Sequence, residues 1–204
     1  MSESCSPVSP VRIAVIQYDP QVGLEHCERN LGRGLALARR AAREGANLIV
    51  LPELANTGYT FNSRAEAYAH AETLHDGPSL KAWADFAREY QVYLAAGFSE
   101  RDGLKLYDSA VLFGPEGRLG HYRKAHGSER GGRFLGCSLI AGTNGWPIGE
   151  VGSAEAEEIL YADVDLSSAR SAPIWNNLND LPRDRRTDLY DANLGYRLHA
   201  PMPR

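Results

Sequence analysis

The chain has 204 residues, of which 43% are hydrophobic and 24% charged, and its formal net charge at pH 7 is −4. This length and composition suit one globular domain with a sizeable core. The slightly acidic balance argues against a surface for nucleic acid or for an anionic membrane. Residues 1–10 are rich in Ser and Pro and lack the apolar core of a signal peptide. We therefore predict a disordered leader over 1–10 and a cytoplasmic protein without a membrane-spanning helix.

The three cysteines are Cys5, Cys27 and Cys137. Their number is odd and their spacing does not match that of metal ligands, so the sequence predicts neither a disulfide framework nor a zinc site. We expect no metal and no other cofactor.

Residues 11–124 alternate between short apolar runs and helical patterns, which indicates an α/β layered domain. Strands are predicted at Val11–Gln17, Leu48–Leu51, Val92–Phe98, Tyr107–Phe113 and Arg118–Arg123. Helices are predicted at Gly23–Glu44, Arg64–Glu72 and Ser79–Tyr90. The last two strands flank Gly-Pro-Glu-Gly, a hairpin turn signal, and the first two are expected to be parallel.

The alternation of short apolar runs with helical patterns ends at Lys124. Residues 128–172 form a predicted C-terminal part with strands at Phe134–Ala141 and Glu158–Val164, and residues 173–204 are interpreted as a polar tail. We treat 11–204 as a single domain, with 11–124 as its N-terminal part.

Glu53 follows directly after the predicted strand Leu48–Leu51 and after Pro52, which ends the strand because it has no N–H to donate. An acid at the carboxyl end of a buried strand lies where open α/β sheets place their ligand crevices. Partial burial would raise its pKa towards the range of a general base. A solvated or helix-capping glutamate is an equally good interpretation of this stretch alone.

Lys124 ends the second hairpin strand, within the run Tyr122-Arg-Lys-Ala-His126. Its ammonium group could enter a crevice at the edge of the sheet, pair with Glu53 and stabilise an oxyanion formed in acyl transfer. For an isolated lysine, a solvated strand end is the better interpretation. The neighbouring His121 and His126 are interpreted as surface residues.

Together these stretches resemble the nitrilase superfamily of carbon–nitrogen hydrolases. The resemblance rests on RIAVIQ before a long helix, GANLIVLPELANTGY, GPEGRLGHYRKAH, FLGCSLIA, EEILYADVDLSSAR and DRRTDLY. It implies a four-layer α-β-β-α sandwich, here incomplete. It also implies that Glu53 matches the general base and Lys124 the lysine that steadies the tetrahedral intermediate.

The nucleophilic cysteine of that family, which lies well downstream of the lysine motif, has no counterpart here. Only Gly127–Arg133 separates YRKAH from FLGCSLIA, so we interpret the sequence as having an internal deletion near Ala125–Ser128. Cys137 lies within FLGCSLIA and is interpreted as a buried strand thiol, and Cys27 as part of the apolar helix face.

Two classes of function follow from the resemblance. One is an amidase or nitrilase that hydrolyses a small amide, nitrile or carbamoyl compound, impaired by the loss of its nucleophile. The other is a non-catalytic relative that binds small molecules or associates with other chains, or a truncated product without a role. Tyr59 and Phe61 are candidates for lining a pocket, although core packing explains them equally well. The family also leads us to expect a homo-oligomer.

Overall fold

The computed structural model describes residues 10–124 and 137–168. The chain divides into two compact units, Met1–Leu166 and Ser167–Arg204. Everything below concerns the first unit. The predicted leader, apart from Pro10, and the predicted tail 173–204 lie outside the described residues.

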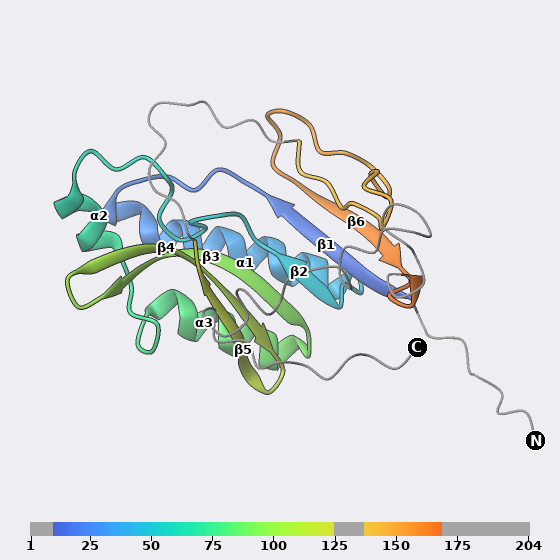
Figure 1. The fold of residues 1–204 in the computed structure, drawn as a ribbon, viewed down its shortest axis with the longest axis horizontal. Helices are drawn as coiled ribbons and strands as arrows, with labels where there is room; N and C mark the ends of the chain where they lie inside the picture. Colours follow the sequence, from blue (N-terminus) through green and yellow to red (C-terminus); the bar gives the residue numbers. More distant parts are fainter. Residues whose placement is uncertain (1–9, 125–136, 169–204) are drawn as a thin grey trace, which may run out of the picture. The chain divides into compact units, whose positions relative to one another are not determined.

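A six-stranded mixed sheet organises the described residues, in the order β5-β4-β3-β2-β1-β6 (Figure 1). Its strands are β1 (Val11–Gln17), β2 (Leu48–Val50), β3 (Tyr93–Asp102), β4 (Lys105–Gly114), β5 (Gly117–Arg123) and β6 (Glu158–Val164). β1, β2 and β3 run parallel, while β4, β5 and β6 join antiparallel at the two sides. This arrangement confirms the predicted parallel unit and the predicted β4–β5 hairpin.

The helices are α1 (Cys27–Arg43), preceded by the short 3-10 turn η1 (Leu24–His26), α2 (Arg64–His70) and α3 (Pro78–Tyr90). α1 and α3 supply Leu35, Trp83 and Phe86 to a core that also holds Ile49 and Phe98 from the sheet. Each strand turns alternate side chains to this core, because successive side chains of a strand point to opposite faces. The core therefore lies between α1 and α3 and one face of the sheet.

The predicted helix Arg64–Glu72 is too long, because α2 ends at His70. Glu72 instead forms an isolated parallel bridge with Glu100: its N–H donates to the Ser99 carbonyl at 2.9 Å, and its own carbonyl accepts from Arg101 N–H at 2.9 Å. Its side chain accepts from the N–H and hydroxyl of Ser79 in the first turn of α3, at 2.9 and 2.6 Å. A residue whose main chain bonds to β3 and whose side chain caps a second helix cannot continue the first one.

The predicted strand Phe134–Ala141 is wrong over its described residues, Cys137–Ala141. Cys137 has a left-handed backbone (φ 57°), which a regular strand does not tolerate, and Ala141 makes only an isolated bridge with Pro147. Hydrogen bonds such as Ile148 N–H to the Ile140 carbonyl (2.8 Å) close an irregular loop on itself. The segment before β6 is therefore a loop.

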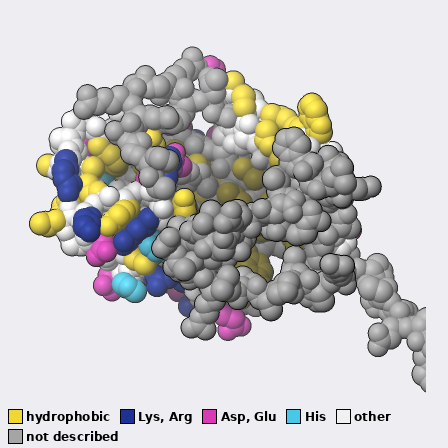
Figure 2. All heavy atoms as spheres, in the orientation of Figure 1, with side chains coloured by type: hydrophobic (Ala, Val, Ile, Leu, Met, Phe, Trp, Pro, Cys, Tyr) yellow, Lys and Arg dark blue, Asp and Glu magenta, His cyan; other side chains and the backbone are white. Residues whose placement is uncertain are grey.

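The fold class is mixed α/β, as predicted, and one sheet with a helical layer on one face is consistent with an incomplete α-β-β-α sandwich. No helix among residues 10–124 and 137–168 is long and apolar enough to span a membrane. Figure 2 shows acidic and basic side chains interspersed on one face of the molecule.

Candidate functional site

Glu53 lies in a tight turn at the carboxyl end of β2, and β3 supports this turn. Leu51 N–H donates to the Ala95 carbonyl at 2.9 Å, Gly97 N–H to the Pro52 carbonyl at 3.2 Å, and Ala55 N–H to the Gly97 carbonyl at 3.0 Å. A Cβ atom on Gly97 would lie 2.7 Å from Glu53 Cα. Only glycine at position 97 lets the turn approach β3 this closely.

The residue after Glu53 has an uncommon backbone conformation. Leu54 has a φ of 47°, in the left-handed region that non-glycine residues rarely adopt. It is nevertheless buried, and its carbonyl accepts from the N–H groups of Thr57 and Gly58 at 3.1 and 3.0 Å. Backbone strain of this kind persists only where the surroundings enforce it, and it gathers at functional sites.

The structure brings Lys124 directly onto Glu53, as the sequence predicts. Lys124 Nζ lies 2.5 Å from Glu53 Oε1 and 3.4 Å from Asp108 Oδ2. Asp108 comes from β4, where it lies opposite Ser99 of β3. The site therefore joins the turn after β2, the middle of β4 and the end of β5.

The two carboxyl groups of this site titrate differently. Burial, together with a hydrogen bond to Glu53 and the negative charge of Glu53, raises the pKa of Asp108 to about 7. The hydrogen bond from Asp108, followed by that from Lys124, lowers the pKa of Glu53. The hydrogen bond to Glu53 raises the pKa of Lys124, so the lysine stays an ammonium. At neutral pH the site thus holds a carboxylate, an ammonium and a group close to its own pKa.

A second cluster on the helical face of the sheet fixes the strand that carries Lys124. Glu100 is 1% exposed and accepts from Arg123 Nη2 at 2.5 Å, Ser109 Oγ at 2.5 Å and His121 Nε2 at 2.8 Å. Burial alone would raise the pKa of Glu100, but these hydrogen bonds lower it to about 2. Arg123 and Lys124 are adjacent, so the Glu100 cluster anchors the end of β5 while Lys124 enters the site.

A crevice of about 1230 Å³ opens beside Glu53. It is lined by the ends of β1 and β2 and the turns after them, including Tyr18, Glu53 and Tyr59, and by Ser138. Lys124 is not among its lining residues, but it contacts Glu53, which is. Of the two aromatic candidates, Tyr59 lines the crevice, whereas the Phe61 ring packs against the His70 ring at 5.3 Å between centroids. The crevice is large enough for a small organic substrate.

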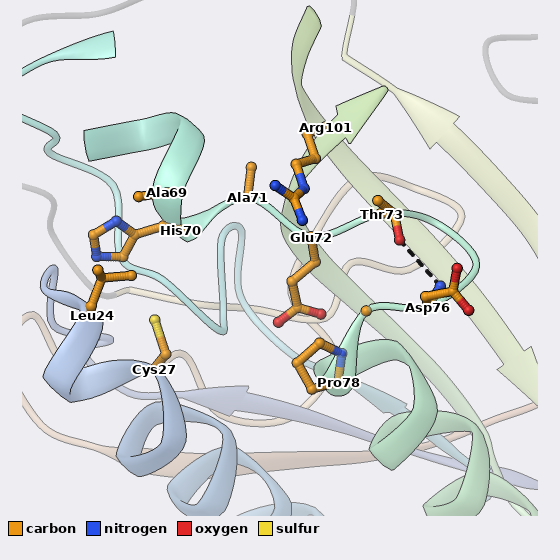
Figure 3. A pocket seen from close by; sticks show the side chains of 11 residues that line it. Leu24, Cys27, Ala69, His70, Ala71, Glu72, Thr73, Asp76, Pro78 and Arg101 are labelled. Atoms are coloured by element: carbon orange, nitrogen blue, oxygen red, sulfur yellow. Dashed lines mark hydrogen bonds between the residues drawn. The ribbon is translucent and has the colours of Figure 1, made fainter. Parts of the chain in front are cut away.

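The described cysteines do not line this crevice. Cys137 is exposed rather than buried in a strand, although the next residue, Ser138, borders the crevice. Cys27 is half-buried in a separate cavity of about 340 Å³, between the start of α1, the end of α2 and the start of α3 (Figure 3). Burial is the first cause that raises the pKa of the Cys27 thiol, which makes it a poor nucleophile. Cys5 lies outside the described residues.

Sequence reasoning missed Asp108 and Glu100, and it placed His121 on the surface. A charged residue within an otherwise apolar strand pattern was the available signal for Asp108. His126 lies outside the described residues. Among residues 10–124 and 137–168, no group of three or more His, Cys, Asp or Glu side chains is arranged to hold a metal ion.

The sequence model of the carbon–nitrogen hydrolase family matches residues 12–130. The chain belongs to this family. The matched range contains Glu53, Asp108 and Lys124, so all three residues of the site lie within the part of the chain that matches the family.

The chain is similar to proteins described as nitrilases and amidases. It is 28% identical over 263 positions to a nitrilase of Pyrococcus abyssi, an alignment that includes 88% of this chain and 99% of the relative. It is 36% identical over 121 positions to the omega-amidase NIT2 of Mus musculus, but that match covers 58% of this chain and only 41% of the relative.

Solved structures agree with the fold. Saccharomyces cerevisiae Nit3, a member of branch 10 of the nitrilase superfamily, matches with a TM-score of 0.66 at 16% identity, covering 84% of this chain and 97% of the other. At that identity the likeness concerns the fold alone. A crystal structure of an N-terminal amidase matches with a TM-score of 0.51 at 28% identity, over 57% of this chain and 28% of the other.

Proposed function

We propose that this chain carries the glutamate–lysine part of a carbon–nitrogen hydrolase site that accepts a small amide, nitrile or carbamoyl compound, and that its hydrolytic activity is impaired. The observation that carries the proposal is the 2.5 Å contact between Lys124 Nζ and Glu53 Oε1, made by residues 71 apart in the sequence. The contact forms at the edge of a crevice of about 1230 Å³.

Each group has a defined chemical role in this proposal. Glu53 is ionised at neutral pH, because its pKa is lowered, and a carboxylate next to a crevice can accept a proton from a nucleophile. The Lys124 ammonium can donate to an oxygen that becomes negative as a carbonyl is attacked. The acyl group of the substrate would lie in the crevice, with its reacting carbon close to both side chains.

Two features of the site support impaired activity. No cysteine within 10–124 or 137–168 lines the crevice, and loss of a nucleophile removes most of the rate in such enzymes. The Lys124 and Glu53 side chains are also 45% and 39% exposed. Solvent weakens their electrostatic effect on a developing charge, because water screens it more than a closed, low-dielectric site does.

An internal deletion after Lys124 explains why the nucleophile is missing. The nitrilase alignment has 263 positions but includes 88% of the 204 residues, which is about 180, so this chain lacks a residue at ~83 of them. Because the alignment covers 99% of the relative, these positions are residues of the relative that have no partner in this chain. This supports a shortened chain rather than two unrelated halves.

A binding protein without turnover is the second candidate. The observation in its favour is that the crevice and the Glu53–Lys124 pair are present, although no cysteine among the described residues lines the crevice. We also propose cytoplasmic localisation, which the sequence leads us to expect, and self-association, which the family leads us to expect.

The test measures ammonia release from a panel of simple amides, nitriles and carbamoyl compounds, for the purified protein and for the variants Cys137→Ala and Glu53→Gln. Very slow or undetectable turnover is expected, and Glu53→Gln should abolish what remains. Turnover that disappears in Cys137→Ala would instead mean that Cys137 serves as the nucleophile, and that the argument for impairment is wrong.

Binding separates the two candidates when no ammonia appears. The chemical shifts of crevice residues are followed by NMR while acetamide or propionamide is added to the wild type and to Glu53→Gln. Weaker binding by the variant would support a site that retains recognition without hydrolysis. The absence of shifts at the crevice in the folded wild type would refute a substrate site at Glu53.

A further inference from the structure

The cavity of about 340 Å³ between the start of α1, the end of α2 and the start of α3 contains polar atoms without partners (Figure 3). It shares no lining residue with the crevice beside Glu53, so it is a separate candidate site. Its volume lies within the range of small-molecule pockets. Two lining side chains each have a buried nitrogen without a hydrogen-bond partner, namely Nε2 of His70 and Nε of Arg101.

His70 is 5% exposed and offers a hydrogen-bond acceptor. Its Nδ1 atom lies 2.7 Å from the Glu66 carbonyl oxygen. A carbonyl only accepts, so Nδ1 carries the hydrogen, and in the neutral ring Nε2 is left as an acceptor. Figure 3 shows the His70 ring on one side of the cavity and Arg101 and Glu72 on the other. A ligand that fills the cavity would satisfy His70 with a donor, such as a hydroxyl or an amide N–H.

Arg101 brings a cation into the cavity. Among residues 10–124 and 137–168 its guanidinium group has no carboxylate partner, and Figure 3 draws no hydrogen bond between it and Glu72. Its guanidinium carbon lies 5.6 Å from the centre of the Tyr68 ring, a contact that stabilises a cation without neutralising it. Since a buried donor without a partner costs free energy, Arg101 favours a ligand with a negatively charged acceptor.

Glu72 brings a carboxylate whose partners in the described part of the chain are uncharged. It accepts from Asn56 Nδ2 at 3.1 Å and from the hydroxyl and N–H of Ser79 at 2.6 and 2.9 Å. A carboxylate has about four acceptor sites, so about one remains free. The other acid that lines the cavity, Asp76, has a side chain that is 85% exposed and lies 3.9 Å from Lys81 Nζ. Glu72 is therefore the acid that a cationic group in the cavity would meet.

We propose that this cavity binds a small polar α-amino acid as a zwitterion. The ligand carboxylate pairs with the Arg101 guanidinium, the ligand ammonium donates to the free acceptor site of Glu72, and a hydroxyl or amide of the ligand side chain donates to His70 Nε2. A simple anion would satisfy Arg101 but approach the Glu72 carboxylate, and a simple cation would have the opposite difficulty. Binding changes no covalent bond, and the proposal does not depend on the function proposed for Glu53.

Cys27 provides the measurement, because it lines the cavity and is half-buried. Its alkylation by N-ethylmaleimide is followed by mass spectrometry in the full-length protein while L-serine, L-asparagine or L-glutamine is added. At a ligand concentration about ten times Kd, alkylation of Cys27 should slow about tenfold, because the cavity is then almost fully occupied. Cys137 is the internal control, since it is exposed and does not line the cavity, and its rate should not change.

Variants and simpler ligands test each charge. Arg101→Met should abolish the protection of Cys27. Arg88→Met is the matched control and should retain it, because Arg88 lies in the last turn of α3, away from the cavity, and binds Asp85 at 2.8 Å. Acetate and ethylamine each carry only one of the two charges, so in the wild type they should bind about tenfold or more weakly than serine.

Each result decides the proposal. Unchanged alkylation of Cys27 with all three amino acids at about 100 mM, well above a millimolar Kd, overturns it and leaves the two nitrogens to water. Equally strong protection by acetate or by ethylamine overturns the zwitterion, and this comparison needs no variant. Protection that persists in folded Arg101→Met, or equal slowing at Cys137, overturns the site. Glu53→Gln should leave the protection unchanged, so a failure of the function proposed at Glu53 is distinguishable from a failure here.

Discussion

Gly97 supports the turn that carries Glu53, and replacing it with alanine should displace that turn. The new Cβ atom would lie 2.7 Å from Glu53 Cα, 2.8 Å from Leu54 N and 2.9 Å from the Pro52 carbonyl oxygen. All three are backbone atoms, so no side chain can rotate away to make room. Either β3 or the turn must move.

The magnitude follows from these contacts. Overpacking of this kind costs about 1–3 kcal/mol. A displaced turn would also weaken the hydrogen bonds between Gly97 and the residues Pro52 and Ala55, at 3.2 and 3.0 Å. We therefore expect Gly97→Ala to lower the free energy of unfolding by about 2 kcal/mol or more. For a chain of this size, each kcal/mol corresponds to a fall in Tm of about 2–4 °C.

The matched control is Gly120→Ala in β5. A Cβ atom there would meet only the Leu112 Cβ atom, at 3.9 Å, which is ordinary contact. Such a change restricts the unfolded chain and should raise stability by about 0.4–1 kcal/mol. Urea unfolding, followed by circular dichroism, compares both variants with the wild type. Equal stability of Gly97→Ala and wild type, or an equal loss in both variants, would refute the argument from close backbone approach.

Two further perturbations test the environment of the site. Glu100→Gln should lower the free energy of unfolding by about 3 kcal/mol, because it leaves the Arg123 guanidinium without its buried anion. The pKa of Glu100 is lower in the folded protein than in the unfolded chain. Glu100 therefore stabilises the fold above about pH 4.5, and this contribution is lost as the pH falls towards 2. If the free energy of unfolding depended on acidic pH in the same way in Glu100→Gln as in the wild type, this reasoning would be contradicted. Tyr18→Phe removes the donor to the buried Ala55 carbonyl (2.6 Å) and should cost about 1–3 kcal/mol in thermal unfolding, whereas an unchanged Tm would mean that water replaces the hydroxyl.

The local pattern of the sequence was sufficient to predict most strands. Val11–Gln17 and Glu158–Val164 were predicted to the residue, because each is a run rich in β-branched and apolar residues. The pairing of Glu53 with Lys124 was raised as one possibility from their positions at strand ends, and the resemblance to the nitrilase superfamily placed both residues in one site. Strands predicted from local sequence can therefore indicate a contact between residues that are far apart in the chain.

The failures have a common physical cause. Glu72 suits a helix by propensity, but its hydrogen bonds go to Ser99 and Ser79, and such tertiary partners are invisible in a local pattern. Asp108 was overlooked for the same reason, because its chemistry depends on Glu53 and Lys124 rather than on its own neighbours. The left-handed backbone of Cys137 likewise has no signal in a run of apolar residues.

The pairing of β1 with β6 has a consequence for how the chain folds during synthesis. Val11 pairs with Val164 and Gln17 with Glu158, so the first strand acquires its outer neighbour only from the far end of the described chain. Until residue 164 has left the ribosome, the outer backbone groups of β1 are open to pairing with another nascent chain. Contacts of such high sequence separation also form slowly. The strand made first is thus completed last, and chaperone binding or aggregation during translation should depend on how fast residues 158–164 arrive.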